Sequence, residues 1–114
     1  MIDIKALSVL LKKEVIKCSL INKARSTINI TYFENEDSIK PICREFSIYE
    51  LQHLIKEDIR KKDFIFSISI YKNHIMISIW TKEGKHRIAS KSELEVLVLG
   101  YSWILEKLNE KNPK

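Results

Sequence analysis

Residues 63–80, DFIFSISIYKNHIMISIW, alternate large apolar and small polar side chains on both sides of Lys72–Asn73. A period of two is typical of a β-strand with one buried face. A two-residue turn at Lys72–Asn73 would pair the two halves as an antiparallel hairpin, with Ile70 opposite Ile75. The alternation therefore predicts a hairpin whose isoleucine-rich face needs an apolar layer to cover it.

The opposite face of this hairpin combines serines with Tyr71, Met76 and Trp80. The next residues, TKEGKHRIAS, predict a second turn around Glu83–Gly84 and a third strand, which would place Ile88 on the core face and Arg87 across from Trp80. The expected unit is a three-stranded meander with a semi-apolar outer face.

The first half of the chain is expected to contain a helix and two further strands. Asp3 can cap a helix that continues to about Cys18, with apolar residues recurring at helical spacing. Alternation over residues 26–33, STINITYF, predicts a half-buried strand, and residues 42–46 predict a shorter one.

Two more helices have recognisable starts. Ser47 and Glu50 form a capping box, so a helix is expected to follow Ser47. The last helix is expected to begin at Ser90 or Ser92, each followed three residues later by an acid, and to end near Asn109.

The last helix has apolar residues on two sides. Besides an ordinary core stripe, Val96, Leu99 and Trp103 recur at spacings of three and four on a different side. Gly100 lies beside them and costs about 1 kcal/mol in a helix interior relative to Ala. A helix of this kind is either central to a core or in contact with a partner.

These elements predict a fold class. We expect an α+β fold with a four- to five-stranded antiparallel sheet and about three helices packed mainly on one face. The 114 residues, 45% of them hydrophobic, suit a single domain over residues 1–114.

The net charge of +5 is unevenly distributed, at +4 for residues 1–25, −3 for residues 26–60 and +4 for residues 61–114. Such an excess suits nucleic acid or an acidic protein, but basic composition without a motif is a weak indication, and a solvated lysine-rich surface is the favoured explanation. Charged residues interrupt the apolar N-terminal stretch, so we expect no signal peptide, no membrane contact and a cytoplasmic protein. Cys18 and Cys43 then suit free thiols, with one disulfide as the alternative.

The residues that usually perform catalysis or bind metal show no familiar spacing. His53, His74 and His86 are scattered over a helix, a turn and a strand end, without paired cysteines. The isolated glycines Gly84 and Gly100 make no phosphate-binding loop. We therefore expect a protein that is not an enzyme and that has no cofactor and no metal site.

The order of a helix, three strands and a helix between FSIYELQHLIKEDI and ASKSELEVLVLGYSWILEKL resembles the double-stranded RNA-binding domain. That resemblance implies that Lys85, Arg87 and Lys91 contact phosphates across a groove. With Lys82, these residues make up the candidate nucleic-acid site, and a sheet-face binder that stacks bases on Trp80 is a variant of the same hypothesis. The element order is also similar to that of small dimeric secretion chaperones.

The leading expectation is a non-enzymatic binding protein, such as a regulator, an inhibitor or a chaperone-like protein, that acts through protein–protein contacts as a homodimer. Exposed apolar patches usually mark such interfaces. The expected interface combines the second stripe of the last helix with the outer sheet face, and its residues are Val96, Leu99, Trp103, Trp80, Tyr71 and Met76. Nucleic-acid binding through Lys82, Lys85, Arg87 and Lys91 is the alternative.

Overall fold

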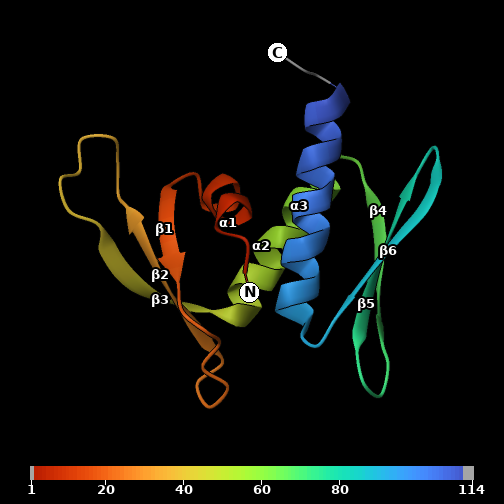
Figure 1. The fold of residues 1–114 in the computed structure, drawn as a ribbon, viewed down its shortest axis with the longest axis horizontal. Coiled ribbons are helices and arrows are strands. Elements are labelled where there is room, and N and C mark those ends of the chain that lie inside the picture. The colour runs from red at the N-terminus through yellow and green to blue at the C-terminus, as the bar shows by residue number, and fades with distance from the viewer. Residues whose placement is uncertain (1, 112–114) are drawn as a thin grey trace.

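The computed structural model describes residues 2–111 and contains three helices and six strands. Figure 1 shows the helices in the middle of the molecule, with a three-stranded sheet on each side. The elements in chain order are α1 (Ile4–Leu11), β1 (Glu14–Cys18), β2 (Thr27–Phe33), β3 (Ile42–Ser47), α2 (Ile48–Lys61), β4 (Ile65–Ile70), β5 (Ile75–Thr81), β6 (Gly84–Ser90) and α3 (Glu93–Lys111).

The strands form two separate antiparallel sheets, ordered β1-β2-β3 and β4-β5-β6. The predicted α+β class is correct, but the predicted single sheet of four to five strands, covered by helices mainly on one face, is wrong. The helices lie between the two sheets, so each sheet packs its inward face against them (Figure 1).

The first helix is shorter than the sequence predicted. It ends at Leu11, because Lys12 adopts a left-handed backbone conformation with φ 57° and ψ 39°. Glu14–Cys18, expected at the end of the helix, is instead strand β1 and pairs with β2, with a bulge between Val15 and Lys17. Valine and isoleucine at positions 15 and 16 favour an extended backbone once a neighbouring strand is present.

The hairpin and the second helix match their predictions. Ile70 pairs with Ile75 across the Lys72–Asn73 turn. The Ser47 hydroxyl accepts a hydrogen bond from the Glu50 backbone N–H at the start of α2. One detail of the meander differs, because Lys85, and not Arg87, lies opposite Trp80.

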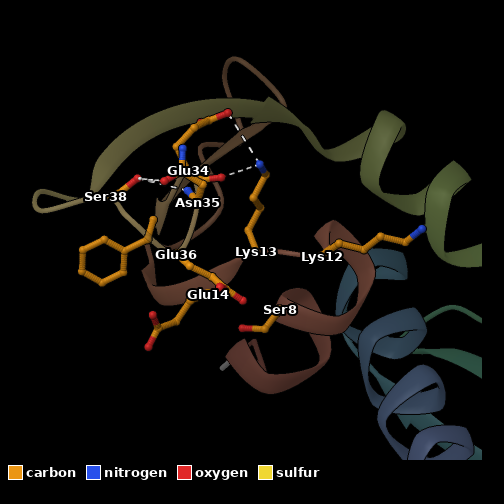
Figure 2. A pocket seen from close by; sticks show the side chains of 9 residues that line it. Ser8, Lys12, Lys13, Glu14, Glu34, Asn35, Glu36 and Ser38 are labelled. Atoms are coloured by element: carbon orange, nitrogen blue, oxygen red, sulfur yellow. Dashed lines mark hydrogen bonds and ion pairs between the residues drawn. The ribbon is translucent and has the colours of Figure 1, made fainter.

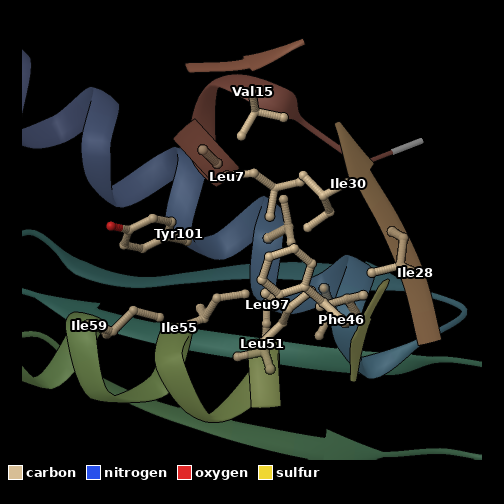
Figure 3. Packing of buried hydrophobic residues seen from close by; sticks show 14 of the residues in the cluster. Leu7, Val15, Ile28, Ile30, Phe46, Leu51, Ile55, Ile59, Leu97 and Tyr101 are labelled. Atoms are coloured by element: carbon tan, nitrogen blue, oxygen red, sulfur yellow. The ribbon is translucent and has the colours of Figure 1, made fainter. Parts of the chain in front are cut away.

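α3 is the central element of the fold. One side contacts α1 and α2, and the other side lies against β5 and β6. Gly100 allows close approach to the sheet, since a Cβ atom there would lie 2.9 Å from Ile77 Cδ1. Apart from Leu99, the residues of the two apolar stripes of α3 therefore belong to one core, part of which is shown in Figure 3.

Polar contacts fix how the helices are placed. Asp3 accepts hydrogen bonds from the Lys5 backbone N–H at the start of α1 and from the Ser102 hydroxyl of α3. The buried Gln52 amide of α2, in the orientation that satisfies both of its polar atoms, donates to the Glu93 carboxylate and accepts from the Leu94 N–H at the start of α3. Each contact satisfies a buried or half-buried polar group at a helix end.

Candidate binding surfaces

The three histidines lie at three separate places and have different neighbours. His53 contacts Glu57 one turn along α2 at 3.1 Å, and His74 stacks on Tyr71. The His86 ring is parallel to the Trp103 ring, with centroids 4.3 Å apart. Within residues 2–111, no three His, Cys, Asp or Glu side chains gather as metal ligands.

A polar hollow of about 540 Å³ lies between α1 and the loop that follows β2, and Figure 2 shows its lining. Lys13 donates to the Glu34 backbone carbonyl at 2.6 Å and lies 3.6 Å from the Glu34 carboxylate. The Ser8 hydroxyl donates to the Ile4 carbonyl and accepts from the Val15 N–H. These groups hold the loop and β1 in place, so we read the hollow as a structural feature.

The second stripe of α3 is used mainly within the chain. Val96 is completely buried, so it packs inside the fold and cannot face a partner. Trp103 is half-buried between His86 and the Lys107 ammonium group, which lies 5.5 Å from the ring centroid. Leu99, at 40% exposure, is the residue of this stripe that is open to solvent.

The first candidate surface is the outer face of the β4-β5-β6 sheet. The helices lie against the other face of this sheet (Figure 1). Strand register places Ile65, Trp80 and Lys85 in one row across the three strands and Met76 on the same face. We call this surface the outer face, and it comprises Ile65, Ser67, Ser69, Met76, Ser78, Trp80, Lys85, Arg87 and Ala89.

Large apolar side chains on the outer face are open to solvent. Ile65 is 70% exposed and Trp80 is 41% exposed, whereas Met76 is half-buried. The Lys85 ammonium group lies 5.4 Å from the centroid of the Trp80 ring, within the range of a cation–π contact. Tyr71, predicted for this face, lies in the turn beyond β4 and stacks on His74 with centroids 4.7 Å apart.

The candidate nucleic-acid residues do not form one cluster. Lys82 lines a hollow beside Trp80 at the β5–β6 turn, and Lys85 and Arg87 lie on the outer face. Lys91 follows the opposite end of β6, and it lies six positions from Lys85 along an extended strand, or roughly 20 Å.

The second candidate surface is a groove that the sequence did not predict. It measures about 1050 Å³ and lies between the residues that begin α1, the β1 edge and the start of α3. Leu20 is 90% exposed, and Ile4 and Ile16 are also exposed. We call it the N-terminal groove; its apolar lining is Ile2, Ile4, Ile16, Leu20 and Ile21, and its lysines are Lys17, Lys23 and Lys91.

The N-terminal groove contains both acids and lysines, and the two kinds of side chain differ in their contacts within the chain. Asp3 accepts hydrogen bonds from Lys5 and Ser102, and Glu95 accepts one from the Ser90 hydroxyl. Among the ion pairs formed within residues 2–111, none involves Lys17, Lys23 or Lys91. The groove lining therefore carries three lysines and two acids, Asp3 and Glu95, so its lysines exceed its acids by one, and each acid already accepts a hydrogen bond from the chain.

The thiol of Cys18 also lines the N-terminal groove. Burial raises the pKa of this thiol, so the neutral form predominates at neutral pH. Cys18 therefore contributes to the groove as a small apolar side chain, and neither it nor Cys43 forms a disulfide.

Comparison of the chain with protein-family models, with curated proteins and with solved structures finds no match. No helix within residues 2–111 combines the length and the apolar character needed to cross a membrane.

Proposed function

We propose that this chain is a non-enzymatic binding protein that acts through protein–protein contacts, and that its outer face holds the partner. The observation that carries the proposal is the solvent-exposed pair of Ile65 and Trp80, which lie opposite each other on the uncovered side of the β4-β5-β6 sheet. Exposed apolar side chains grouped on one face commonly mark an interface, and tryptophan is enriched at such sites.

Charge on the outer face indicates the chemistry of the partner. Lys85 and Arg87 are both exposed and lie on this face, which has no acidic side chain. A partner with acidic side chains around an apolar centre would complement this surface. The serines near the centre are small enough to let a partner backbone approach the sheet closely.

A homodimer, expected from the sequence, is the other form of this proposal. Its main support was the second stripe of α3, and the burial of Val96 leaves Leu99 as the exposed part of that stripe. A two-fold contact through the outer face would bring Lys85 and Arg87 of both copies together, which disfavours self-association there. We also propose a cytoplasmic location, supported by the free thiols of Cys18 and Cys43.

Site-specific photocrosslinking in the cells that contain the protein tests the proposal. A photoreactive phenylalanine analogue replaces Trp80 in one variant and Tyr49 of α2, which is 65% exposed, in a matched control. We expect a discrete protein adduct from position 80 and none of that size from position 49, because Tyr49 of α2 lies outside the outer face.

The mass of the adduct distinguishes the alternatives. An adduct with twice the mass of the chain indicates a homodimer, whereas an adduct that nuclease removes indicates nucleic acid. The same adducts from both positions, or none from position 80, would contradict binding through the outer face.

Nucleic-acid binding is the second candidate function. It is supported by the row that places the Lys85 ammonium group over the exposed Trp80 ring, an arrangement suited to stacked bases and phosphates. We then expect binding that weakens steeply with salt and that is lost in Lys85→Glu/Arg87→Glu. Lys5→Glu/Lys40→Glu makes the same change of charge elsewhere and is the control. If both double variants lost nucleic-acid binding equally, the effect would come from net charge and not from the outer face.

A further inference from the structure

The N-terminal groove is a second surface, formed by other residues than the outer face. It brings together segments that are far apart in the chain, namely the residues around Ile4, the β1 edge and the start of α3 at Ser92. Leu20, at 90% exposure, and Ile16, at 40%, are on its surface. A groove of this size with an aliphatic lining is large enough to accept several side chains of a ligand.

The backbone of β1 is available along part of the groove. β1 pairs with β2, and the Val15 N–H on its other edge donates to the Ser8 hydroxyl at 3.1 Å, so α1 covers the edge there. The Ser19 N–H donates to the Asn29 carbonyl and therefore points toward β2. Because successive residues alternate in direction, the polar backbone groups of Cys18 point away from β2, toward the open edge.

Charge distinguishes between possible occupants. Three lysines, Lys17, Lys23 and Lys91, and two acids, Asp3 and Glu95, line the groove, so the lysines exceed the acids by one. A second copy of the chain would place a groove of the same net positive charge against this one, which is less favourable than an acidic ligand. The aliphatic lining has no aromatic ring on which a base could stack, so nucleic acid also fits poorly.

We propose that the N-terminal groove binds an extended, acidic peptide segment of a partner protein. The segment pairs with β1 at Cys18, its apolar side chains lie on Ile4, Ile16 and Leu20, and its carboxylates approach the three lysines. Addition of a strand to an exposed sheet edge is a common mode of peptide recognition, in which backbone bonds give affinity and side-chain contacts give specificity.

Selection from a displayed library of random nine-residue peptides on the full-length protein tests this proposal. We expect the selected peptides to alternate aspartate or glutamate with aliphatic residues and to bind more weakly as salt increases. In the complex, the Cys18 amide is expected to gain protection from hydrogen exchange. Selection of peptides without acidic residues, or no selection at all, would overturn the proposal.

Variants connect the selected peptide to the groove. We expect Leu20→Asp to weaken binding at least about tenfold, because it removes an apolar contact and adds a like charge. Ile39→Asp is the matched control, since Ile39 is 92% exposed and lies outside the groove. Lys17→Glu/Lys91→Glu is likewise compared with Lys40→Glu/Lys72→Glu. Equal effects in a variant and its control would contradict the proposal.

Two further measurements distinguish a lipid ligand from a peptide ligand, and the groove from the outer face. Vesicles of phosphatidylcholine with phosphatidylglycerol test a lipid ligand, and binding to them that Leu20→Asp abolishes, without any selected peptide, would replace the peptide by a membrane surface. Ile65→Asp changes the outer face, so it should leave the affinity for the peptide unchanged. The two proposals can therefore fail independently: a result that contradicts peptide binding in the groove does not contradict binding at the outer face, and a result against the outer face does not contradict the groove.

Discussion

Gly100 has no side chain at the point where α3 lies against β5. A Cβ atom there would lie 2.9 Å from Cδ1 and 3.3 Å from Cγ2 of Ile77, closer than atoms pack without displacement. The helix thus gives up roughly 1 kcal/mol of helix propensity in exchange for a close approach to the sheet. The glycine that looked costly in the sequence has a packing role in the structure.

Gly100→Ala is expected to destabilise the protein by about 1 kcal/mol, since overpacking costs about 1–3 kcal/mol and higher helix propensity returns about 1 kcal/mol. Ile77→Val removes the nearest atom, so the double variant should lose less stability than the sum of the two single variants. Urea denaturation of all four proteins measures this coupling. Additive losses would show that the contact does not limit the packing.

Asp58, Lys62 and Tyr101 form a polar contact between α2 and α3. The Lys62 ammonium group donates to the Asp58 carboxylate at 2.7 Å, and the buried Tyr101 hydroxyl donates to the same oxygen. Burial opposes ionisation of Asp58, but the two hydrogen bonds and the charges of Lys62 and Lys61 outweigh it and lower its pKa. Burial and the Asp58 carboxylate raise the pKa of Tyr101, so its hydroxyl stays protonated and donates at neutral pH.

This contact predicts a dependence of stability on pH. Because the pKa of Asp58 is lower in the folded state, its contribution is complete above about pH 5 and is lost as the pH falls through the folded pKa. Tyr101→Phe should cost about 1–3 kcal/mol at pH 7 and should reduce the loss of stability on acidification. Tyr49→Phe on the exposed side of α2 is the control and should change neither. Identical acid sensitivity of wild type and Tyr101→Phe would count against this account.

At the scale of elements, the boundary between α1 and β1 is set by Lys12. Its left-handed backbone conformation ends the helix and turns the chain into β1. A residue with a side chain pays roughly 1–2 kcal/mol for that conformation, which glycine adopts freely. The apolar spacing from Ile4 onward continues past this point, so it gives no sign of the boundary.

Lys12→Gly should therefore stabilise the protein by about 0.5–1 kcal/mol, the relief of the left-handed conformation less the greater freedom of glycine in the unfolded chain. Lys5→Gly inside α1 should have the opposite sign and cost about 1 kcal/mol. Thermal unfolding followed by circular dichroism compares the two variants. A loss of stability in Lys12→Gly would contradict the proposed role of Lys12.

For the whole molecule, α3 joins two meanders that would otherwise have separate cores. Its sides pack against α1 and α2 and against the β4-β5-β6 sheet, and the buried residues form one cluster. The radius of gyration is 14.8 Å, compared with about 13 Å for a compact domain of this length. The broad shape leaves much of both sheets accessible to partners.

A single core predicts a single unfolding transition. In a Trp80→Phe variant, the fluorescence of Trp103 reports on the contact between α3 and the β4-β5-β6 sheet, whereas far-ultraviolet circular dichroism reports on all elements. We expect the two urea transitions to coincide. Separate midpoints would show that the two meanders unfold independently.

The sequence by itself determined the local features of this protein. Alternation and the Lys72–Asn73 turn set the hairpin register, and Ser47 set the start of α2, because these depend on residues close together in the chain. The two-sided character of α3 was also visible, together with the possibility that this helix lies inside a core.

Only the tertiary structure decided the rest. Glu14–Cys18 is a strand because β2 lies beside it, and the strands form two sheets because the helices fill the space between them. The same packing buries Val96 and assembles the N-terminal groove around Leu20. These outcomes depend on contacts between distant segments. The spacing of apolar residues shows that an element has an apolar face, but it does not show which other element will cover that face.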